Sequence, residues 1–322
     1  MIKKLALIGC GYWGKNYVKT LLSMNASLKY VCDTSEPSIA IPEGSIFTKN
    51  IEEILNDSEI DKIIVAVPTA HIFEVVKKCL FAGKNVLMEK PMTKSSTKAK
   101  ELKKMADEKN LILMVGHIFD YHPALKKLKE LINQGEIGKV LYAYSIRAAP
   151  GPVRNSSGTN ALWDLAPHDL SIFLNLFGDF TGELNAFGSD FIEKDVLDSV
   201  TFSMKFKEVF AEAHLRWIDA EKNRKLTVIG DKKIAVFDDL AKDKLKIYTT
   251  FVDFNEKGKV VEKGVTVPEL ENNSPLENQC RHFIECVENN TVPISNAEEG
   301  IKVVELIEKI ESKIRSQNES SI

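Results

Sequence analysis

The first third of the chain alternates short apolar runs with stretches of helical periodicity. Residues 5–8 form a continuous apolar run, which is typical of a parallel strand buried on both faces. Residues 15–24 then repeat apolar positions at helical spacing, and a second apolar run occupies 28–32. This alternation predicts strand, turn and helix in succession, as in an open parallel α/β sheet.

The same alternation continues to about residue 118. We expect further strands at 62–67, 85–88 and 111–115 and further helices at 72–82 and 97–110. The carboxyl ends of parallel strands meet at one edge of a sheet, where ligands bind. Pro68, His71, Glu89, Lys90 and His117 follow these strands, so we expect them around one crevice.

The rest of the chain has a different pattern. The expected helices are 121–132, 165–177, 276–289 and 297–316, and the expected strands are 139–147, 200–206, 208–216, 225–229 and 233–238. The close succession of alternating runs after residue 200 predicts a largely antiparallel sheet. We therefore predict an α/β protein of two domains, a Rossmann domain at 1–118 and a second α/β domain at 119–322. The C-terminal helices could pack back on the first domain.

A glycine-rich turn follows the first apolar run. Gly9, Gly11 and Gly14 have the spacing G-x-G-x-x-G, with Tyr12 and Trp13 between them. In a dinucleotide-binding turn the first glycine permits the tight bend, the second admits the pyrophosphate, and the third lets helix and strand pack closely. The helix that follows offers unpaired N–H groups and the positive end of its dipole to the phosphates. Strand, turn and helix in this order favour dinucleotide binding over an ordinary glycine turn.

An acidic residue ends the second strand. Asp33 stands 22 residues after Gly11, where a carboxylate accepts hydrogen bonds from an adenosine ribose. The same carboxylate would repel the 2′-phosphate of NADP(H), and no arginine stands beside it. The sequence therefore predicts NAD as the cofactor, with a turn or helix-cap role as the alternative for Asp33.

Composition and charge exclude several classes of protein. With 44% hydrophobic and 28% charged residues in 322, the chain can bury a sizeable core. A net charge of −3 and a pI near 6.1 give no basic face for nucleic acid. No apolar run reaches the roughly 20 residues of a membrane-spanning helix. The first ten residues resemble a lipoprotein signal, but their apolar stretch is too short, so we expect a cytoplasmic protein.

The cysteines do not form a recognisable framework. They are odd in number and scattered, without a Cys-x-x-Cys pair, which argues against disulfides and a zinc site. Cys280, His282 and Cys286 lie close together, but in an amphipathic helical pattern with no fourth ligand nearby. We expect buried thiols and no metal.

Four segments together are similar to the Gfo/Idh/MocA oxidoreductase family. They are Gly11-Tyr12-Trp13-Gly14, Glu89-Lys90-Pro91, Val115-Gly116-His117 and Trp163-Asp164-Leu165-Ala166-Pro167-His168. The resemblance covers nearly the whole chain and implies an NAD-dependent dehydrogenase acting on a CH–OH group of a sugar. Within the family, the first and last segments look most like the branch that oxidises C3 of UDP-N-acetylglucosamine or its uronic acid, for cell-surface polysaccharide biosynthesis.

The resemblance also implies roles for particular residues. Lys90, Asp164 and His168 are the expected catalytic group, in which His168 removes the hydroxyl proton, Lys90 assists and Asp164 orients the pair. The expected cofactor contacts are Gly9, Gly11, Tyr12, Trp13, Gly14, Asp33, Pro68, Thr69, His71, Glu89, Lys90, Pro91, His117 and Trp163. Lys90, Trp163, Asp164 and His168 are also expected to contact the substrate.

The chemistry of the residues agrees with these roles. A secondary alcohol needs a base that titrates near neutral pH, and histidine does so with little adjustment. Asp164 and His168 stand four apart, so on a helix they share one face. Pro167 is tolerated only in the first helical turn, which predicts Asp164 at or near the N-cap. A plain cap for Asp164 and a core histidine for His168 remain the structural alternatives.

The second domain offers cations for a pyrophosphate. Guanidinium groups match phosphate geometry, so we expect some of Arg147, Arg154, Lys222 and Arg224 to bind a nucleotide-sugar substrate, with solvated surface charge as the alternative. An exposed face of an antiparallel sheet is commonly covered by a partner, and members of the family associate in this way. We therefore expect a homodimer or homotetramer.

Three other functions stay open at this level. One is a nucleotide-sugar 3-ketoreductase, and another is a dehydrogenase of free sugars or inositol. A catalytically silent dinucleotide sensor is the non-enzymatic alternative. The presence of Lys90, Asp164 and His168 argues against silence.

Overall fold

We describe the protein from a computed structural model in which residues 4–151, 158–253 and 259–319 are defined. The chain divides into two compact units. Unit 1 consists of Met1–Tyr121 and Asn273–Glu305, and unit 2 consists of His122–Asn272 and Leu306–Ile322. The division lies after Tyr121 rather than after residue 118, and a later segment returns to unit 1.

Unit 1 is built on a parallel sheet of six strands in the order β3-β2-β1-β4-β5-β6. The strands are β1 (Lys4–Ile8), β2 (Leu28–Cys32), β3 (Ile46–Thr48), β4 (Ile60–Val65), β5 (Asn85–Met88) and β6 (Leu113–Val115). The helices are α1 (Tyr12–Ser23), α2 (Ile51–Leu55), α3 (Thr69–Phe81), α4 (Ser96–Glu108), the short 3-10 helix η1 (Ile118–Tyr121) and α7 (Pro275–Asn289). The predicted Rossmann-type parallel sheet is confirmed; β3 and α2 were not predicted, because three or five residues are too few to show periodicity.

α7 completes the core of unit 1, although it lies far along the chain. Leu276, Cys280 and Phe283 belong to the same buried apolar cluster as Leu7 of β1 and Tyr17 of α1. All five cysteines are buried and unpaired, which confirms the prediction of buried thiols.

The outer edge of β6 is also covered by a late segment. The Val115 N–H donates to the Ser295 carbonyl at 2.8 Å, and Ser295 Oγ lies 2.6 Å from the Val115 carbonyl oxygen. Tyr121 Oη lies 2.9 Å from Ser295 Oγ. These bonds pair backbone groups that an edge strand would otherwise expose.

Unit 2 contains an eight-stranded sheet in the order β14-β13-β12-β11-β7-β10-β9-β8. Only the β7–β10 pair is parallel among its described pairs, so the predicted largely antiparallel sheet is confirmed. The strands are β7 (Val140–Ala148), β8 (Phe180–Ser189), β9 (Ser199–Phe206), β10 (Val209–Arg216), β11 (Asn223–Gly230), β12 (Ile234–Asp238), β13 (Leu245–Asp253) and β14 (Lys259–Thr266). Its helices are α5 (Pro123–Asn133) and α6 (Ala161–Phe177), and the last helix of the chain is α8 (Ala297–Glu319). β8, β13 and β14 were not predicted.

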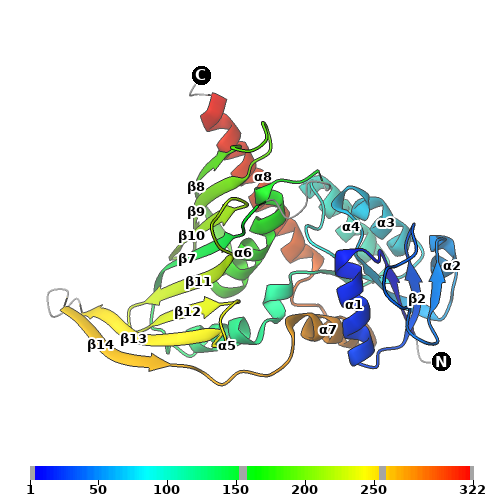
Figure 1. Cartoon of the computed structure of the whole chain (residues 1–322), viewed down its shortest axis with the longest axis horizontal. Coiled ribbons are helices and arrows are strands. Elements are labelled where there is room, and N and C mark those ends of the chain that lie inside the picture. The colour runs from blue at the N-terminus through cyan, green and yellow to red at the C-terminus, as the bar shows by residue number, and fades with distance from the viewer. Residues whose placement is uncertain (1–3, 152–157, 254–258, 320–322) are drawn as a thin grey trace. The chain divides into compact units, whose positions relative to one another are not determined.

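α6 lies across one face of this sheet, as Figure 1 shows. It packs on β9 and β10, where Phe173 meets Phe206 edge-on at a ring-centroid distance of 5.8 Å. Along β10 the residues alternate between buried and partly exposed, as expected when one face of a sheet is covered.

The start of α6 corrects the prediction that Pro167 lies in the first turn of this helix. Asn160 is the N-cap, and its side-chain oxygen accepts the Trp163 N–H at 3.0 Å. Asp164 therefore lies within the first turn, and Pro167 stands inside the helix. Pro167 has no N–H to donate to the carbonyl of Trp163, but burial of neighbouring apolar residues such as Ala166 and Leu170 outweighs this loss.

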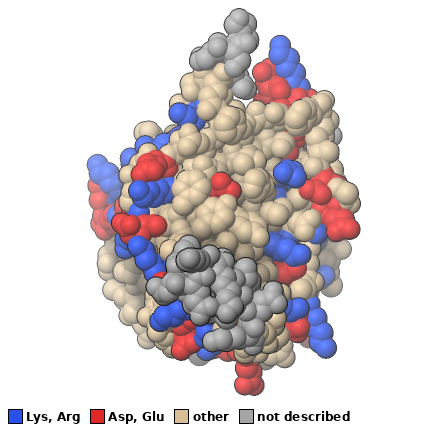
Figure 2. All heavy atoms as spheres, turned by 90° about the vertical axis from the view of Figure 1, so that its left-hand side faces the viewer, with Lys and Arg blue, Asp and Glu red and all other residues tan. Residues whose placement is uncertain are grey.

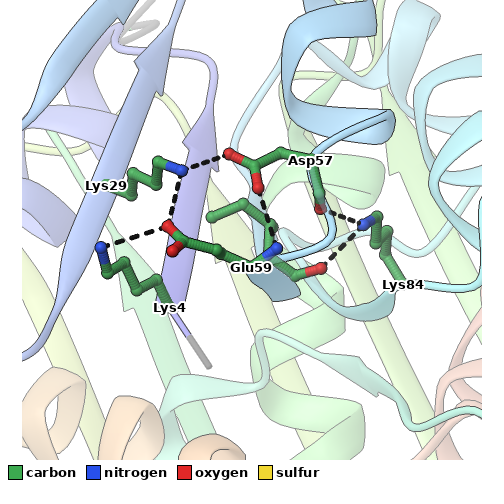
Figure 3. Close-up of polar contacts among 6 residues, drawn as sticks. Lys4, Lys29, Asp57, Glu59 and Lys84 are labelled. Carbon is green, nitrogen blue, oxygen red and sulfur yellow. Dashed lines mark hydrogen bonds and ion pairs between the residues drawn. The ribbon is translucent and has the colours of Figure 1, made fainter. Parts of the chain in front are cut away.

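The amino ends of the strands in unit 1 are tied by charged groups (Figure 3). Lys29 of β2 bonds Asp57 and Glu59, and Lys4 of β1 bonds Glu59 at 3.2 Å. The Lys84 ammonium donates to the carbonyl oxygens of Asp57 at 2.8 Å and of Ile60 at 2.7 Å. This network lies at the edge of the sheet opposite to the predicted crevice. In the described part of the chain, no helix is long and apolar enough to cross a membrane.

Lys84 gives a test of this network. Its side chain is 6% exposed, so Lys84→Met leaves two inward carbonyl groups without their donor. We expect the free energy of unfolding to fall by about 1–3 kcal/mol, measured by urea titration at neutral pH. Lys104→Met is the matched control, because that side chain is 77% exposed and should change stability by less than about 0.5 kcal/mol. Equal stability of the two variants would contradict this role of Lys84.

Candidate functional site

Two glycines in the turn between β1 and α1 are required by the backbone around them. Gly9 has φ +94°, and a Cβ there would lie 2.5 Å from the carbonyl oxygen of Ala66. A Cβ on Gly14 would lie 2.0 Å from the carbonyl oxygen of Gly9. A larger residue at Gly9 would therefore clash with the backbone that follows β4, and one at Gly14 would clash with the backbone that follows β1.

Gly11 differs, because among the described residues, its own chain neighbours apart, nothing lies within 4 Å of a Cβ placed there. Gly11 is the N-cap of α1 and, having no side chain, makes no capping hydrogen bond at this end of the helix. The missing side chain therefore leaves space directly at the positive end of a twelve-residue helix. This open cradle suits the pyrophosphate of a dinucleotide. Tyr12, 62% exposed, and Trp13 follow with their rings edge-on.

Asp33 lies beside this turn and is held in place by it. Its Oδ2 accepts the Cys10 N–H at 2.6 Å, and its Oδ1 accepts the Ser35 N–H at 3.1 Å. Partial burial works to raise the pKa of Asp33, but these hydrogen bonds outweigh it and hold the pKa below its ordinary value. The carboxylate is therefore ionised and fixed where β2 ends.

The residues after β4 continue the same edge of the sheet. The Ala66 N–H donates to the Ile8 carbonyl at 2.8 Å, which joins this segment to the end of β1. Pro68 then caps α3, which begins at Thr69, and the His71 side chain is exposed in its first turn.

The segment after β5 carries Glu89, Lys90 and Pro91. Glu89 is buried, and its Oε1 accepts the Tyr17 hydroxyl at 2.8 Å while its Oε2 accepts the Lys90 N–H at 3.2 Å. Burial raises the pKa of Glu89, against the lowering effects of Tyr17 and Lys90. The Lys90 side chain is half-buried, and the Lys90–Pro91 peptide bond is cis.

His117 follows β6, the neighbouring strand. The Gly116 N–H donates to the Met88 carbonyl at 2.7 Å, so the two segments run side by side. His117 is 1% exposed, and neither ring nitrogen has a hydrogen-bond partner in the described chain. Burial, and next the charge of Lys90, lower the pKa of His117 to about 4. A neutral imidazole with two unpaired nitrogens is therefore available to a ligand.

Two members of this region were missed by sequence reasoning. Tyr17 donates to Glu89, and Gln279 Nε2 donates to the Tyr17 oxygen at 2.9 Å. A polar tyrosine on the buried face of α1 was a usable signal. Gln279 gave none, because only folding brings α7 to this place.

In unit 2, α6 carries Trp163, Asp164 and His168. Asp164 Oδ2 accepts the Trp217 Nε1–H at 3.3 Å, which fixes one carboxylate oxygen. His168 is half-buried one helical turn later, so the two share a face as predicted from their spacing. Trp163 is 5% exposed and donates its indole N–H to Glu311 of α8 at 3.2 Å. Its ring therefore packs within the chain, and its expected contact with cofactor and substrate stays a prediction.

The four predicted phosphate ligands are not alike. Arg147 is 5% exposed and bonds Asp169 through two nitrogens, at 2.7 and 3.3 Å. Arg224 bonds Asp239 at 3.0 Å. Both guanidinium groups thus have carboxylate partners within the chain, and their expected role as ligands of a substrate pyrophosphate stays a prediction. Lys222 is exposed before β11, and Arg154 lies outside the described residues.

Family models match both parts of the chain. The model of an oxidoreductase family with an NAD-binding Rossmann fold matches residues 3–117, and that of the GFO/IDH/MocA C-terminal domain matches 125–236. The chain belongs to the Gfo/Idh/MocA family. NAD is the cofactor of this fold, and the open cradle at Gly11 and the carboxylate of Asp33 fit it.

Named relatives in the Gfo/Idh/MocA family act on different substrates. The chain is 34% identical over 131 residues to the UDP-N-acetylglucosamine 3-dehydrogenase of Acidithiobacillus ferrooxidans, covering 41% of this chain and 40% of that protein. It is 30% identical over 186 residues to the NADP-dependent scyllo-inositol 2-dehydrogenase of Bacillus subtilis, covering 54% and 52%. The matches therefore span about half the length of these relatives or less.

Solved structures of similar proteins show the same fold. A structure of the Acidithiobacillus ferrooxidans 3-dehydrogenase superposes with a TM-score of 0.82 at 24% identity, covering 98% of this chain and 99% of that one. Levoglucosan dehydrogenase in complex with NADH and levoglucosan gives a TM-score of 0.82 at 20% identity, covering 98% and 97%. These likenesses show the fold of the family and leave the substrate open.

The burial of His117 predicts a pH-dependent stability. Between pH 6.5, the ordinary histidine pKa, and about pH 4, His117 is protonated in the unfolded chain but stays neutral in the folded protein. This contribution to stability is complete above pH 6.5 and is lost as the pH falls toward 4.

We expect the free energy of unfolding to fall between pH 7.5 and 4.5 by on the order of 2–3 kcal/mol more in the wild type than in His117→Gln. Urea titrations at the two pH values measure this difference. Parallel pH dependences for the two proteins would show that His117 is not buried in its neutral form.

Proposed function

We propose that this protein is an NAD-dependent dehydrogenase that oxidises the C3 hydroxyl of a UDP-linked amino sugar, for cell-surface polysaccharide biosynthesis in the cytoplasm. The observation that carries the proposal is the set of chemical groups present together in one member of the family. The chain has the glycine turn after β1 and Lys90 after β5. It also has Asp164 and His168 on one face of α6. The 34% identity to a UDP-N-acetylglucosamine 3-dehydrogenase supports the substrate.

Unit 1 holds the cofactor in this proposal. The end of α1 at Gly11 receives the pyrophosphate, and Asp33 accepts hydrogen bonds from the adenosine ribose. Bound NAD supplies the acceptor for the hydride that leaves the sugar carbon. His117 offers this ligand a neutral ring with two unpaired nitrogens.

The hydroxyl proton goes to His168 of α6. Asp164 orients this group, and its own carboxylate is fixed by the indole N–H of Trp217. The Lys90 ammonium stabilises the negative charge that develops on the hydroxyl oxygen as its proton leaves. The C–H electron pair leaves as hydride and the O–H proton goes to His168, so the alcohol becomes a ketone.

A free sugar or inositol is the second candidate substrate, and a specific observation favours it. Arg147 is paired with Asp169, and Arg224 is paired with Asp239. Of the predicted phosphate ligands that the structure describes, this leaves the exposed Lys222 without a carboxylate partner. A scyllo-inositol dehydrogenase also stands among the relatives. The ketoreductase direction and the silent sensor have no comparable support.

We also propose that the chain forms a homodimer or homotetramer through the face of the unit 2 sheet that α6 does not cover. Tyr142, Tyr144 and Phe210 gather there, and the rings of Tyr142 and Phe210 stack at 5.9 Å. Figure 2 looks onto this side and shows charged side chains around an area of mostly uncharged residues. Such an area is suited to association with a second copy.

Cofactor preference tests the role of Asp33. We expect NAD to bind more tightly than NADP by on the order of tenfold or more, because the fixed carboxylate repels a 2′-phosphate. Asp33→Ser should narrow the gap, whereas Asp107→Ser, which removes an exposed carboxylate from α4, should not. Calorimetric titration measures both affinities. Equal binding of the two cofactors to the wild type would overturn the assignment.

The substrate is tested by comparing UDP-N-acetylglucosamine, its uronic acid, and the same sugars without nucleotide. Removing UDP should lower turnover as well as affinity, because remote binding energy aligns the reacting carbon. NADH absorbance gives the rates. Lys90→Ala and His168→Ala should each lower turnover by about 10²–10⁴-fold in folded protein. Equal catalytic efficiency with and without nucleotide would move the protein to the free-sugar or inositol alternative.

A further inference from the structure

The helix α6 has a weak point between Asp164 and His168. Pro167 lies between them, buried and inside the helix. Because proline has no N–H, the carbonyl group of Trp163 cannot receive its usual hydrogen bond, and the proline ring crowds that carbonyl group. The helix alone therefore fixes Asp164 relative to His168 less firmly than an uninterrupted helix would.

The part of α6 before the proline is held from the end of β10. Trp217 directly follows this strand and is 5% exposed. Its backbone N–H donates to the Asp198 carbonyl oxygen at 2.8 Å, and its indole N–H donates to Asp164 Oδ2 at 3.3 Å. The backbone of Trp217 is thus anchored where its side chain reaches the carboxylate of Asp164.

The part of α6 after the proline is held from β7. Arg147 of this strand donates to Asp169 from Nε at 2.7 Å and from Nη2 at 3.3 Å. Both side chains are buried, with 5% of Arg147 and 2% of Asp169 exposed. A guanidinium group that meets a carboxylate through two nitrogens fixes direction as well as distance. Because Asp169 directly follows His168, this contact restrains the backbone beside His168.

The two contacts come from one place in the sheet. β7 and β10 are neighbouring parallel strands, as Figure 1 shows, and Arg147 pairs with Leu215. The last residues of the two strands, Ala148 and Arg216, also pair, and Trp217 comes next. Arg147 and Trp217 are therefore carried by the same end of this strand pair, which holds both parts of α6.

We propose that Trp217 and Arg147 are positioning residues for the catalytic pair of α6, which they hold from the sheet on the two sides of Pro167. Trp217 acts on Asp164 directly, and Arg147 acts on His168 through the residue that follows it. The proposal rests on the proposed function for the use of this pair, but the restraint on α6 can be measured without a substrate.

Hydrogen–deuterium exchange measures this restraint in the full chain without cofactor or substrate. Trp217→Phe keeps an aromatic ring and removes the indole N–H, so we expect amides 164–171 to exchange about two- to tenfold faster than in the wild type. Tyr142→Phe is the matched control, because it also removes one hydrogen that an aromatic side chain donates to a carboxylate of unit 2, that of Glu212. It should leave these amides unchanged. Equal exchange in the two variants would overturn the proposal.

Pro167→Ala separates a restraint on the helix from a loss of packing. Alanine restores the N–H that can donate to the carbonyl group of Trp163, so α6 depends less on its contacts with the sheet. The increase in exchange that Trp217→Phe causes should therefore be smaller in the Pro167→Ala background, by about twofold or more. A lost packing contact would give the same increase in both backgrounds, and that result would overturn the role of Trp217.

The contact of Arg147 has its own variants. Arg147→Lys keeps the charge but cannot make the two-nitrogen contact, and Asp169→Asn removes the negative charge and one acceptor. Both should accelerate exchange of the same amides. If Asp169→Asn does not fold, Arg147→Met combined with Asp169→Leu removes both charges, a replacement that often preserves stability. Unchanged exchange in the folded variants would overturn the role of Arg147.

Steady-state kinetics connect the restraint with the reaction. With any sugar that the protein oxidises, Trp217→Phe and Arg147→Lys should each lower kcat by about tenfold or more and change KM by less than about twofold. A raised KM for UDP sugars with unchanged kcat in Arg147→Lys would instead make Arg147 a phosphate ligand and overturn its positioning role. If no sugar is oxidised, the proposed function fails, while the exchange experiments still decide the roles of Trp217 and Arg147.

Discussion

The close approach of backbone segments at the carboxyl edge of the parallel sheet is the constraint on which unit 1 depends. β1 ends beside Ala66, at the start of the connection between β4 and α3. In the first turn of α1, Gly14 then lies against the carbonyl group of Gly9. No side chain fits at Gly9 or Gly14, because carbonyl oxygens of Ala66 and Gly9 occupy the space of a Cβ. Gly11 stands between them with open space around it. In this turn the surrounding backbone therefore excludes a side chain at Gly9 and Gly14, whereas the space beside Gly11, at the end of α1, is open.

The polar groups beside this turn are buried at different costs. Asp33 is stabilised as a carboxylate by two backbone N–H groups of the turn and the segment after it. Glu89 has a less complete set of bonds and a raised pKa. The ring nitrogens of His117 have no hydrogen-bond partner among the described residues, and its pKa is lowered to about 4. Buried groups that are poorly paired cost stability, so their concentration at one strand edge marks a place organised around a ligand and a charge.

Unit 2 changes what can be expected of its arginines. A free guanidinium suits a pyrophosphate, but Arg147 already meets Asp169 in a buried, two-point contact. Asp169 directly follows His168, so this ion pair ties the backbone of the proposed base to β7. Breaking a buried pair by removing one partner typically costs about 3–5 kcal/mol. Arg147 therefore contributes to the placement of α6, and its expected role toward phosphate stays a prediction.

The sequence by itself determined the features that depend on neighbours along the chain. The apolar runs gave the parallel sheet, the glycine spacing gave the dinucleotide turn, and the placement of Asp33 and Lys90 after strands put both at one edge. The antiparallel sheet of the second part also followed from local alternation, as did the shared helix face of Asp164 and His168. Each of these rests on periodicity or turn chemistry within about thirty residues, which a single sequence displays directly.

Only the tertiary structure decided the features that depend on distant partners. α7 returns to unit 1, which brings Gln279 to Tyr17 across most of the chain. Arg147 forms an ion pair with Asp169, and Arg224 forms one with Asp239, although the local sequence pattern does not pair these residues. α6 begins at Ala161 rather than at residue 165 and contains Pro167 in its interior, because long-range burial of its apolar residues outweighs the local preference against proline. In each case a contact between distant residues selected one partner from many that the local sequence allowed.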